Sequence, residues 1–258
     1  MERTPGQEYY SGLSGFLTLF ETGTPALMYH KVATQPRRAL SKALYVNQDL
    51  FRRQMRELRE AGFSSIPIGE VCENPDNRRK RLTITFDDGY QNVLENAAGP
   101  LAENGFQAIQ FLVAGQLGGE NEWDRRLGEA PEKLMDKVEI REWLAAGHEI
   151  GAHTMTHPHL STLPVEVARE EITASKKRLE DSFSAPVVHF CYPYGDCNKR
   201  IRDLVEEAGY QTACTTDFGV NTSATPRFEI KRLLARRASR RPQELLARLR
   251  DKLFNIRL

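Results

Sequence analysis

The sequence has no long hydrophobic run, few cysteines and no excess of one charge. No stretch approaches the roughly 18 consecutive apolar residues of a membrane-spanning helix. The only cysteines are Cys72, Cys191, Cys197 and Cys214, which form no C-x-x-C pair and are too few for a disulfide scaffold in 258 residues. This excludes a zinc ribbon. Lys and Arg number 36 against 35 Asp and Glu, so the net charge of +1 argues against a nucleic-acid partner.

The remaining composition is that of a soluble globular protein, with 40% hydrophobic and 28% charged residues. Its length fits a single α/β domain. The first 20 residues make a poor signal peptide, because they carry Glu2 and Glu8 and their apolar stretch is broken by glycines and serines. We therefore expect a cytoplasmic protein.

Short apolar runs alternate with amphipathic stretches along most of the chain. Strands are predicted at Pro25–Tyr29, Leu82–Phe86, Ala108–Val113, His148–His153, Val187–Tyr192 and Gln211–Thr215. Helices are predicted at about Asn47–Ala61, Gln91–Asn104, Asp136–Ala146, Pro164–Ser182 and Asn198–Ala208, with stops at Gly62, Gly105, Gly147 and Gly209. This order indicates a parallel sheet covered by helices. Periodicity does not choose between a barrel and a doubly wound sheet.

Two segments fall outside this alternation. Gly115–Pro131 is rich in glycine and acidic residues and contains Trp123. It is expected to form a long loop, either one wall of a site or a plain surface excursion. The C-terminal segment Arg227–Leu258 has 11 Lys or Arg against three acidic residues. We expect a closing basic helix over 241–258, packed on or beside the domain, and an alternative use is peripheral contact with an anionic membrane or an acidic partner.

The first candidate for chemistry is the pair Asp87-Asp88. The two carboxylates follow an apolar strand and precede Gly89, so a turn can bring both into one cleft. Because close carboxylates repel each other, a cation is expected between them, with one carboxylate as ligand and the other as base. An ordinary Asp-Asp-Gly turn is the alternative reading.

The second candidate is the pair His153 and His157. Histidines four residues apart lie on one face of a helical turn and can bind one metal ion together. With one carboxylate they make a ligand set that leaves positions open for water and substrate. This set suits Zn²⁺, and also Fe²⁺, Co²⁺ or Ni²⁺.

Two further segments lie at expected strand ends. Phe190–Gly195 contains Tyr192, Pro193 and Tyr194, which could line a sugar-binding groove or close the core as an aromatic turn. A backbone N–H there could also bind an oxyanion. His30 ends an early strand, which in a parallel α/β fold faces the side of the site.

Together these segments resemble the polysaccharide deacetylases of carbohydrate esterase family 4, the NodB-homology domain. TFDDG at 85–89, HTMTH at 153–157 and YPYG at 192–195 match three motifs of that family, and LMYHKV at 27–32 is similar to its exopolysaccharide (poly-N-acetylglucosamine) branch. The resemblance implies a distorted (β/α)₇ barrel of NodB type over 25–240, preceded by an N-terminal extension, 1–24. It also implies metal-dependent removal of N-acetyl groups from the amino sugars of an exopolysaccharide, with zinc as the foremost metal.

The resemblance also implies individual roles. Asp87 would be the base, and Asp88, His153 and His157 would bind the metal. Tyr194 would donate its backbone N–H to the oxyanion, with Tyr192, Pro193 and Trp123 as candidate substrate contacts.

The sequence departs from the family's pattern at two positions. Cys191 occupies the place of the arginine in R-x-P-Y-G, and no C-terminal Leu-x-His motif is present. We expect His30 to supply the acid and Arg232 to supply a cation beside Asp87. Two alternatives stay open: a deacetylase or deformylase of a glycolipid or small amide, and a degenerate homologue that binds glycan without turnover.

Overall fold

Seven parallel strands close into a ring. The computed structural model describes residues 9–37, 39–125 and 128–236. The ring follows the order β1 (Thr24–Tyr29), β5 (Arg81–Phe86), β6 (Ile109–Leu112), β7 (Glu149–Ala152), β8 (His189–Cys191), β9 (Thr212–Phe218) and β11 (Ile230–Leu234). The first strand closes it, because Leu27 lies opposite Ile84 of β5 on one side and opposite Leu233 of β11 on the other. The expected (β/α)₇ barrel is confirmed.

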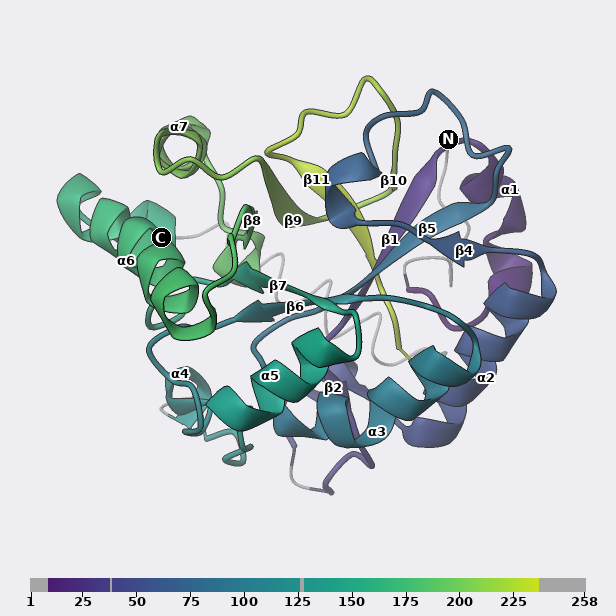
Figure 1. The fold of residues 1–258 in the computed structure, drawn as a ribbon, viewed down its shortest axis with the longest axis horizontal. Helices are drawn as coiled ribbons and strands as arrows, with labels where there is room; N and C mark the ends of the chain where they lie inside the picture. Colours follow the sequence, from purple (N-terminus) through teal and green to yellow (C-terminus); the bar gives the residue numbers. More distant parts are fainter. Residues whose placement is uncertain (1–8, 38, 126–127, 237–258) are drawn as a thin grey trace, which may run out of the picture.

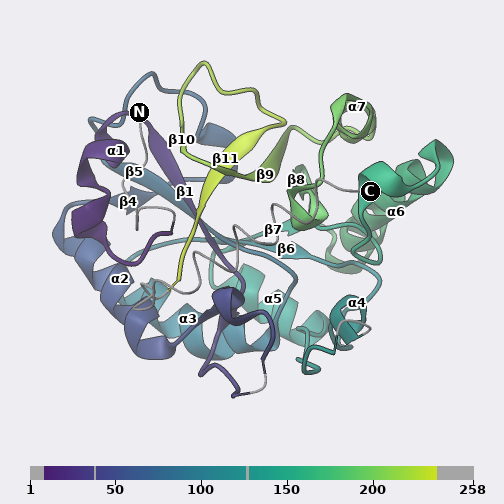
Figure 2. The same ribbon diagram turned by 180° about the vertical axis from the view of Figure 1, so that it is seen from behind.

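Helices surround the ring in both ribbon views (Figures 1 and 2). The longer ones are α2 (Gln48–Glu60), α3 (Gln91–Glu103), α5 (Lys137–Ala145), α6 (Val165–Phe183) and α7 (Lys199–Glu207). Side-chain caps begin three of them, at Asn47, Asp136 and Asn198. The four predicted glycine stops all have positive φ, between 68° and 85°. The five predicted helices are therefore confirmed.

The two faces of the ring are packed differently. Side chains that cluster in the interior are mostly small or medium in size: Ala26, Ile109, Phe111, Cys191, Cys214 and Ile230. Outside, Tyr29, Phe51, Phe86 and Trp143 join strands to helices, with ring centroids 5.1–5.9 Å apart. Burial of each such side chain stabilises the fold by about 1.5–3 kcal/mol. This outer layer holds the strands that carry the site.

Several short elements were not predicted. They are α1 (Leu17–Glu21), β2 (Lys31–Val32), β3 (Tyr45–Val46), β4 (Ser64–Ser65), α4 (Glu122–Arg125) and β10 (Val220–Asn221). The most important omission is β11, the seventh strand of the ring. Its apolar run is interrupted by Arg232, whose side chain is only 1% exposed. A buried arginine disguised a barrel strand as a polar segment.

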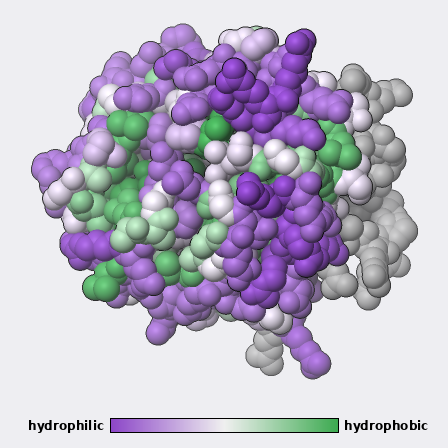
Figure 3. Space-filling view, turned by 45° about the vertical axis from the view of Figure 1, so that its right-hand side comes forward, coloured by the Kyte–Doolittle hydropathy of each residue, from purple (hydrophilic) through white to green (hydrophobic). Residues whose placement is uncertain are grey.

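The first described residues pack onto the barrel. The Tyr10 N–H donates to the Leu234 carbonyl, and the Arg236 N–H donates to the Tyr10 carbonyl, both at 2.9 Å. The helix expected over 241–258 lies outside the described residues. Within 9–37, 39–125 and 128–236, no helix combines the length and hydrophobicity needed to cross a bilayer. Hydrophilic residues cover most of the face shown in Figure 3.

Candidate active site

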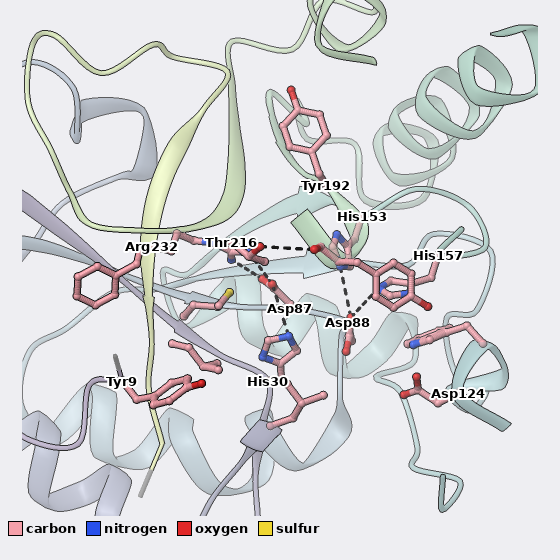
Figure 4. Close-up of a pocket in the computed structure, with 16 residues that line it drawn as sticks. Tyr9, His30, Asp87, Asp88, Asp124, His153, His157, Tyr192, Thr216 and Arg232 are labelled. Carbon is pink, nitrogen blue, oxygen red and sulfur yellow. Dashed lines mark hydrogen bonds and ion pairs between the residues drawn. The ribbon is translucent and has the colours of Figure 1, made fainter. Parts of the chain in front are cut away.

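A cavity of about 300 Å³ opens at the carboxyl ends of the barrel strands (Figure 4). Nine of the ten predicted site residues line it: His30, Asp87, Asp88, Trp123, His153, His157, Tyr192, Tyr194 and Arg232. Pro193 is buried in the turn after β8 and is not among the lining residues. The barrel thus brings together side chains that are up to 202 positions apart, from His30 to Arg232.

Asp88, His153 and His157 form a buried cluster that fits a metal ion. Asp88 Oδ1 lies 3.4 Å from His153 Nε2 and 3.3 Å from His157 Nε2, and it has no hydrogen-bond partner among the described residues. A tetrahedral ion with bonds of about 2.0–2.1 Å places its ligand atoms at such separations. Burial tends to raise the pKa of Asp88, but the two histidines outweigh it and hold the pKa well below its usual range. The donor set therefore suits a divalent cation.

The expectation that the two histidines share a helical turn is wrong. His153 follows β7, and the chain then runs through Thr154 and His157 with φ of 66° and 63°. The His157 N–H donates to Thr154 Oγ1 at 3.0 Å, and Glu171 of α6 accepts from the backbone of the same loop. Side-chain hydrogen bonds replace helical ones here, so a folded loop brings the two rings together.

The surroundings of the histidines fix their orientation. His153 Nδ1 lies 2.7 Å from the Cys191 carbonyl oxygen, which leaves Nε2 directed at Asp88. His157 is packed between Trp123 and Tyr194, with ring centroids 4.7 Å and 4.6 Å away. This packing places both imidazoles for ligation before any ion arrives.

Asp87 lies beside this cluster and forms a separate pair. Arg232 donates to its two carboxylate oxygens at 2.7 Å and 2.8 Å, and Arg232 Nε donates to the Thr215 carbonyl. Both partners are buried. Burial tends to raise the pKa of Asp87, but the guanidinium outweighs this and lowers it. Asp87 is thus kept as a carboxylate at neutral pH, as a base requires.

His30 lies on the other side of Asp87. His30 Nε2 is 3.8 Å from Asp87 Oδ2, and His30 Nδ1 is buried without a hydrogen-bond partner among the described residues. Burial lowers the pKa of His30, while the two aspartates oppose this. A histidine at this distance can exchange a proton with a group bound between it and Asp87.

Aromatic side chains shape the walls of the cavity. The ring of Tyr194 is 43% exposed and stacks on His159 at 3.9 Å. Tyr192 is fully buried, and its hydroxyl donates to the Phe228 carbonyl. Residues that the sequence reasoning missed also line the cavity: Tyr9, Met28, Leu44, Asp124, Thr216, Phe218 and Leu234. Asp124 had a signal, since it directly follows Trp123.

A family model described as polysaccharide deacetylase matches residues 74–213, which include the two aspartates, both histidines and the YPYG turn. The chain belongs to this family. The peptidoglycan-N-acetylglucosamine deacetylase of Bacillus cereus is 30% identical over 151 residues, covering 57% of this chain and 61% of that protein. The chain spans less than two thirds of the length of the curated relatives it matches.

Solved structures of deacetylases share the fold. The Streptococcus pyogenes deacetylase PplD, solved in complex with acetate, matches with a TM-score of 0.72 at 22% identity, covering 88% of this chain and 98% of that one. A polysaccharide deacetylase from Bacillus cereus matches with a TM-score of 0.70 at 25% identity, covering 88% and 69%.

This family member replaces the motif arginine by a long reach across the barrel. Cys191 stands where the usual motif has arginine, and its Sγ lies 3.6 Å from Asp87. Arg232 enters from β11 instead, and its Nη2 lies 3.1 Å from that Sγ. Burial raises the pKa of the Cys191 thiol to about 11, so the thiol stays neutral and does not compete for the guanidinium.

Proposed function

We propose that the protein is a metal-dependent hydrolase that removes N-acetyl groups from the amino sugars of an exopolysaccharide. The observation that carries this proposal is the pairing of two sites in one cavity. Asp88 and the two histidines offer three ligands, and Asp87 stands beside them as a carboxylate held by Arg232. The similarity to a deacetylase of peptidoglycan N-acetylglucosamine supports the substrate class.

Asp88, His153 and His157 would hold the ion, with zinc foremost and Fe²⁺, Co²⁺ or Ni²⁺ as alternatives. When bound, the ion supplies a Lewis acid that polarises the acetyl carbonyl and acidifies water. Three protein ligands leave positions open for both, as catalytic rather than structural sites require.

The chain's own residues move the protons. Asp87 accepts the proton of the attacking water, and Arg232 holds its two oxygens in place during this step. His30 then donates a proton to the sugar nitrogen, because an amide anion would be a very poor leaving group. The backbone N–H of Tyr194 donates to the oxygen that becomes negative when the carbonyl is attacked. The products are acetate and a free amino sugar.

The test is acetate release from N-acetylglucosamine oligomers by zinc-loaded protein, with a chelated sample beside it. We expect release that chelation abolishes and added zinc restores. Failure of zinc-loaded protein to release acetate from the oligomers would contradict the proposal. Release from a glycolipid alone would favour the membrane-associated alternative to which the basic C-terminal segment points, and glycan binding without release from any substrate would favour the degenerate homologue.

A further inference from the structure

Asp124 is an acidic side chain of the cavity that the proposed mechanism does not use. It lies on α4, directly after Trp123, and is 8% exposed. In Figure 4 it lies on the same side of the cavity as Asp88 and His157, away from Tyr9. It is not a member of either cluster of possible metal ligands found among the described residues. The ion and the base are therefore accounted for without it.

The carboxylate of Asp124 is poorly compensated. Within the described part of the chain it forms no ion pair, and its one side-chain hydrogen bond comes from Asn121 Nδ2 to Oδ2, at 3.2 Å. Burial raises its pKa, and the charge of Asp88 adds to this effect. A half-desolvated carboxylate with one donor gains free energy from another donor. That donor has to come from the cavity.

The segment around Asp124 is held rigidly. Asn121 is 2% exposed, and its Oδ1 accepts from the Glu132 N–H at 2.7 Å. Glu132 in turn accepts from the Tyr45 hydroxyl at 2.7 Å, which ties the segment to β3. Because this chain of bonds fixes the carboxylate in advance, little conformational entropy is lost when a ligand binds.

Trp123 and Asp124 together match one kind of ligand. Trp123 offers an indole ring at the wall of the cavity and Asp124 offers an acceptor next to it. A pyranose has an apolar C–H face and hydroxyl donors at its edge. Resting on the proposed function, we propose that Asp124 is a specificity-determining residue that accepts a hydrogen bond from a ring hydroxyl of the sugar that carries the acetyl group.

The experiment compares two substrates in three zinc-loaded variants. Asp124→Ala and Asp124→Asn are measured beside Asp217→Asn, a matched control that removes the exposed carboxylate of Asp217 outside the cavity lining. The substrates are N-acetylglucosamine oligomers and 4-nitrophenyl acetate, an acetyl ester with no sugar hydroxyl. We expect kcat/KM for the oligomers to fall roughly 10- to 100-fold in Asp124→Ala and less in Asp124→Asn. Ester hydrolysis and zinc content stay unchanged, and the control behaves as wild type.

Sugars that each lack one hydroxyl then complete a cycle. Removal of the hydroxyl that Asp124 binds reduces kcat/KM in the wild type and leaves Asp124→Ala unaffected. Equal losses on sugar and ester would overturn the inference, since Asp124 would then act on the metal centre or the fold. So would unchanged oligomer kinetics, or deoxy sugars that lose equally in both proteins. A wild type that cleaves the ester and never the oligomers would instead refute the proposed function itself.

Discussion

Two adjacent aspartates occupy different electrostatic environments. Asp88 has a φ of 76°, so the chain turns between the two residues and their side chains diverge. Asp87 faces Arg232 and His30, whereas Asp88 faces the two histidines. Each has a lowered pKa, but the cause is a guanidinium for one and a pair of imidazoles for the other. One turn thus divides the proposed work of base and ligand between neighbours.

Replacing each aspartate by asparagine separates these two roles. Asp88→Asn is expected to lose most of its zinc, because one of only three protein ligands is weakened. Asp87→Asn is expected to retain zinc and to lose kcat by about 10²- to 10⁴-fold, the usual contribution of a general base. Zinc content measured after dialysis, together with kcat, checks both. If both variants lose zinc equally, the division of roles is wrong.

Loss of Arg232 is expected to shift the acidic limb of the pH profile. Its guanidinium lowers the pKa of Asp87, so Arg232→Gln lets that pKa rise. Because the base must be ionised, kcat/KM then begins to fall at a higher pH. Lys231→Gln is the matched control, since Lys231 is the exposed neighbour on the same strand. An acidic limb that stays in place in Arg232→Gln would show that this pairing does not set the ionisation of Asp87.

The proposed acid predicts the opposite limb. His30 has to be protonated to donate, and its pKa is lowered by burial. We expect kcat/KM to fall as the pH rises through a value below about 6.5, the ordinary pKa of histidine. His30→Asn should keep zinc, lose most turnover and lose this limb. Full activity in that variant would exclude His30 as the acid.

At the scale of single elements, the sequence predicted strands better than it predicted how polar residues sit between them. Six apolar runs and five amphipathic stretches became strands and helices at nearly the expected residues. The strand β11 escaped because Arg232, which points into the barrel, breaks its apolar pattern. The loop of His153 and His157 was mistaken for a helical turn because its left-handed residues are not glycines. Both failures occur where the site requires unusual residues.

The turn after β8 depends on Gly195. Its φ is +72°, and an added Cβ would collide with Oγ1 of Thr216 and lie 2.9 Å from its backbone nitrogen. Gly195→Ala is expected to destabilise the protein by about 3 kcal/mol or more and to displace Tyr194. Gly209→Ala is the control, because Gly209 has a φ of +79° with no heavy atom within 4 Å of an added Cβ. It should cost only about 1 kcal/mol, measured by urea unfolding. Equal costs would refute the steric argument.

At the scale of the whole molecule, closure of the ring was beyond the reach of periodicity. Strands buried on both faces have the same apolar pattern in a barrel and in an open sheet. Closure depends on β1 pairing with both β5 and β11, a contact between distant parts of the chain. Only the resemblance of the motifs to a known family pointed to the barrel, whereas the residues of the metal cluster could be found from their types and spacing alone.

The metal cluster is expected to stabilise the entire barrel. Its ligands come from β5 and the loop after β7, so an ion that binds only the folded chain shifts the unfolding equilibrium. Free zinc at 100 times its dissociation constant should add about 2.7 kcal/mol to the free energy of unfolding. Thermal unfolding with and without zinc checks this, with His157→Ala as the control that should show no gain. A wild type that zinc leaves unchanged would contradict a pre-formed site.

Because the barrel is a ring, the order in which its motifs are read depends on where the chain is opened. The strand β1 lies between β5 and β11, and Tyr10 is hydrogen-bonded to Leu234 and Arg236, so the two ends of the described chain are neighbours in space. A circular permutant opened just before β5 would keep each cavity side chain in place. In that permutant His30 would follow Arg232, and the proposed acid would become a histidine near the C-terminus, where the usual family motif has one.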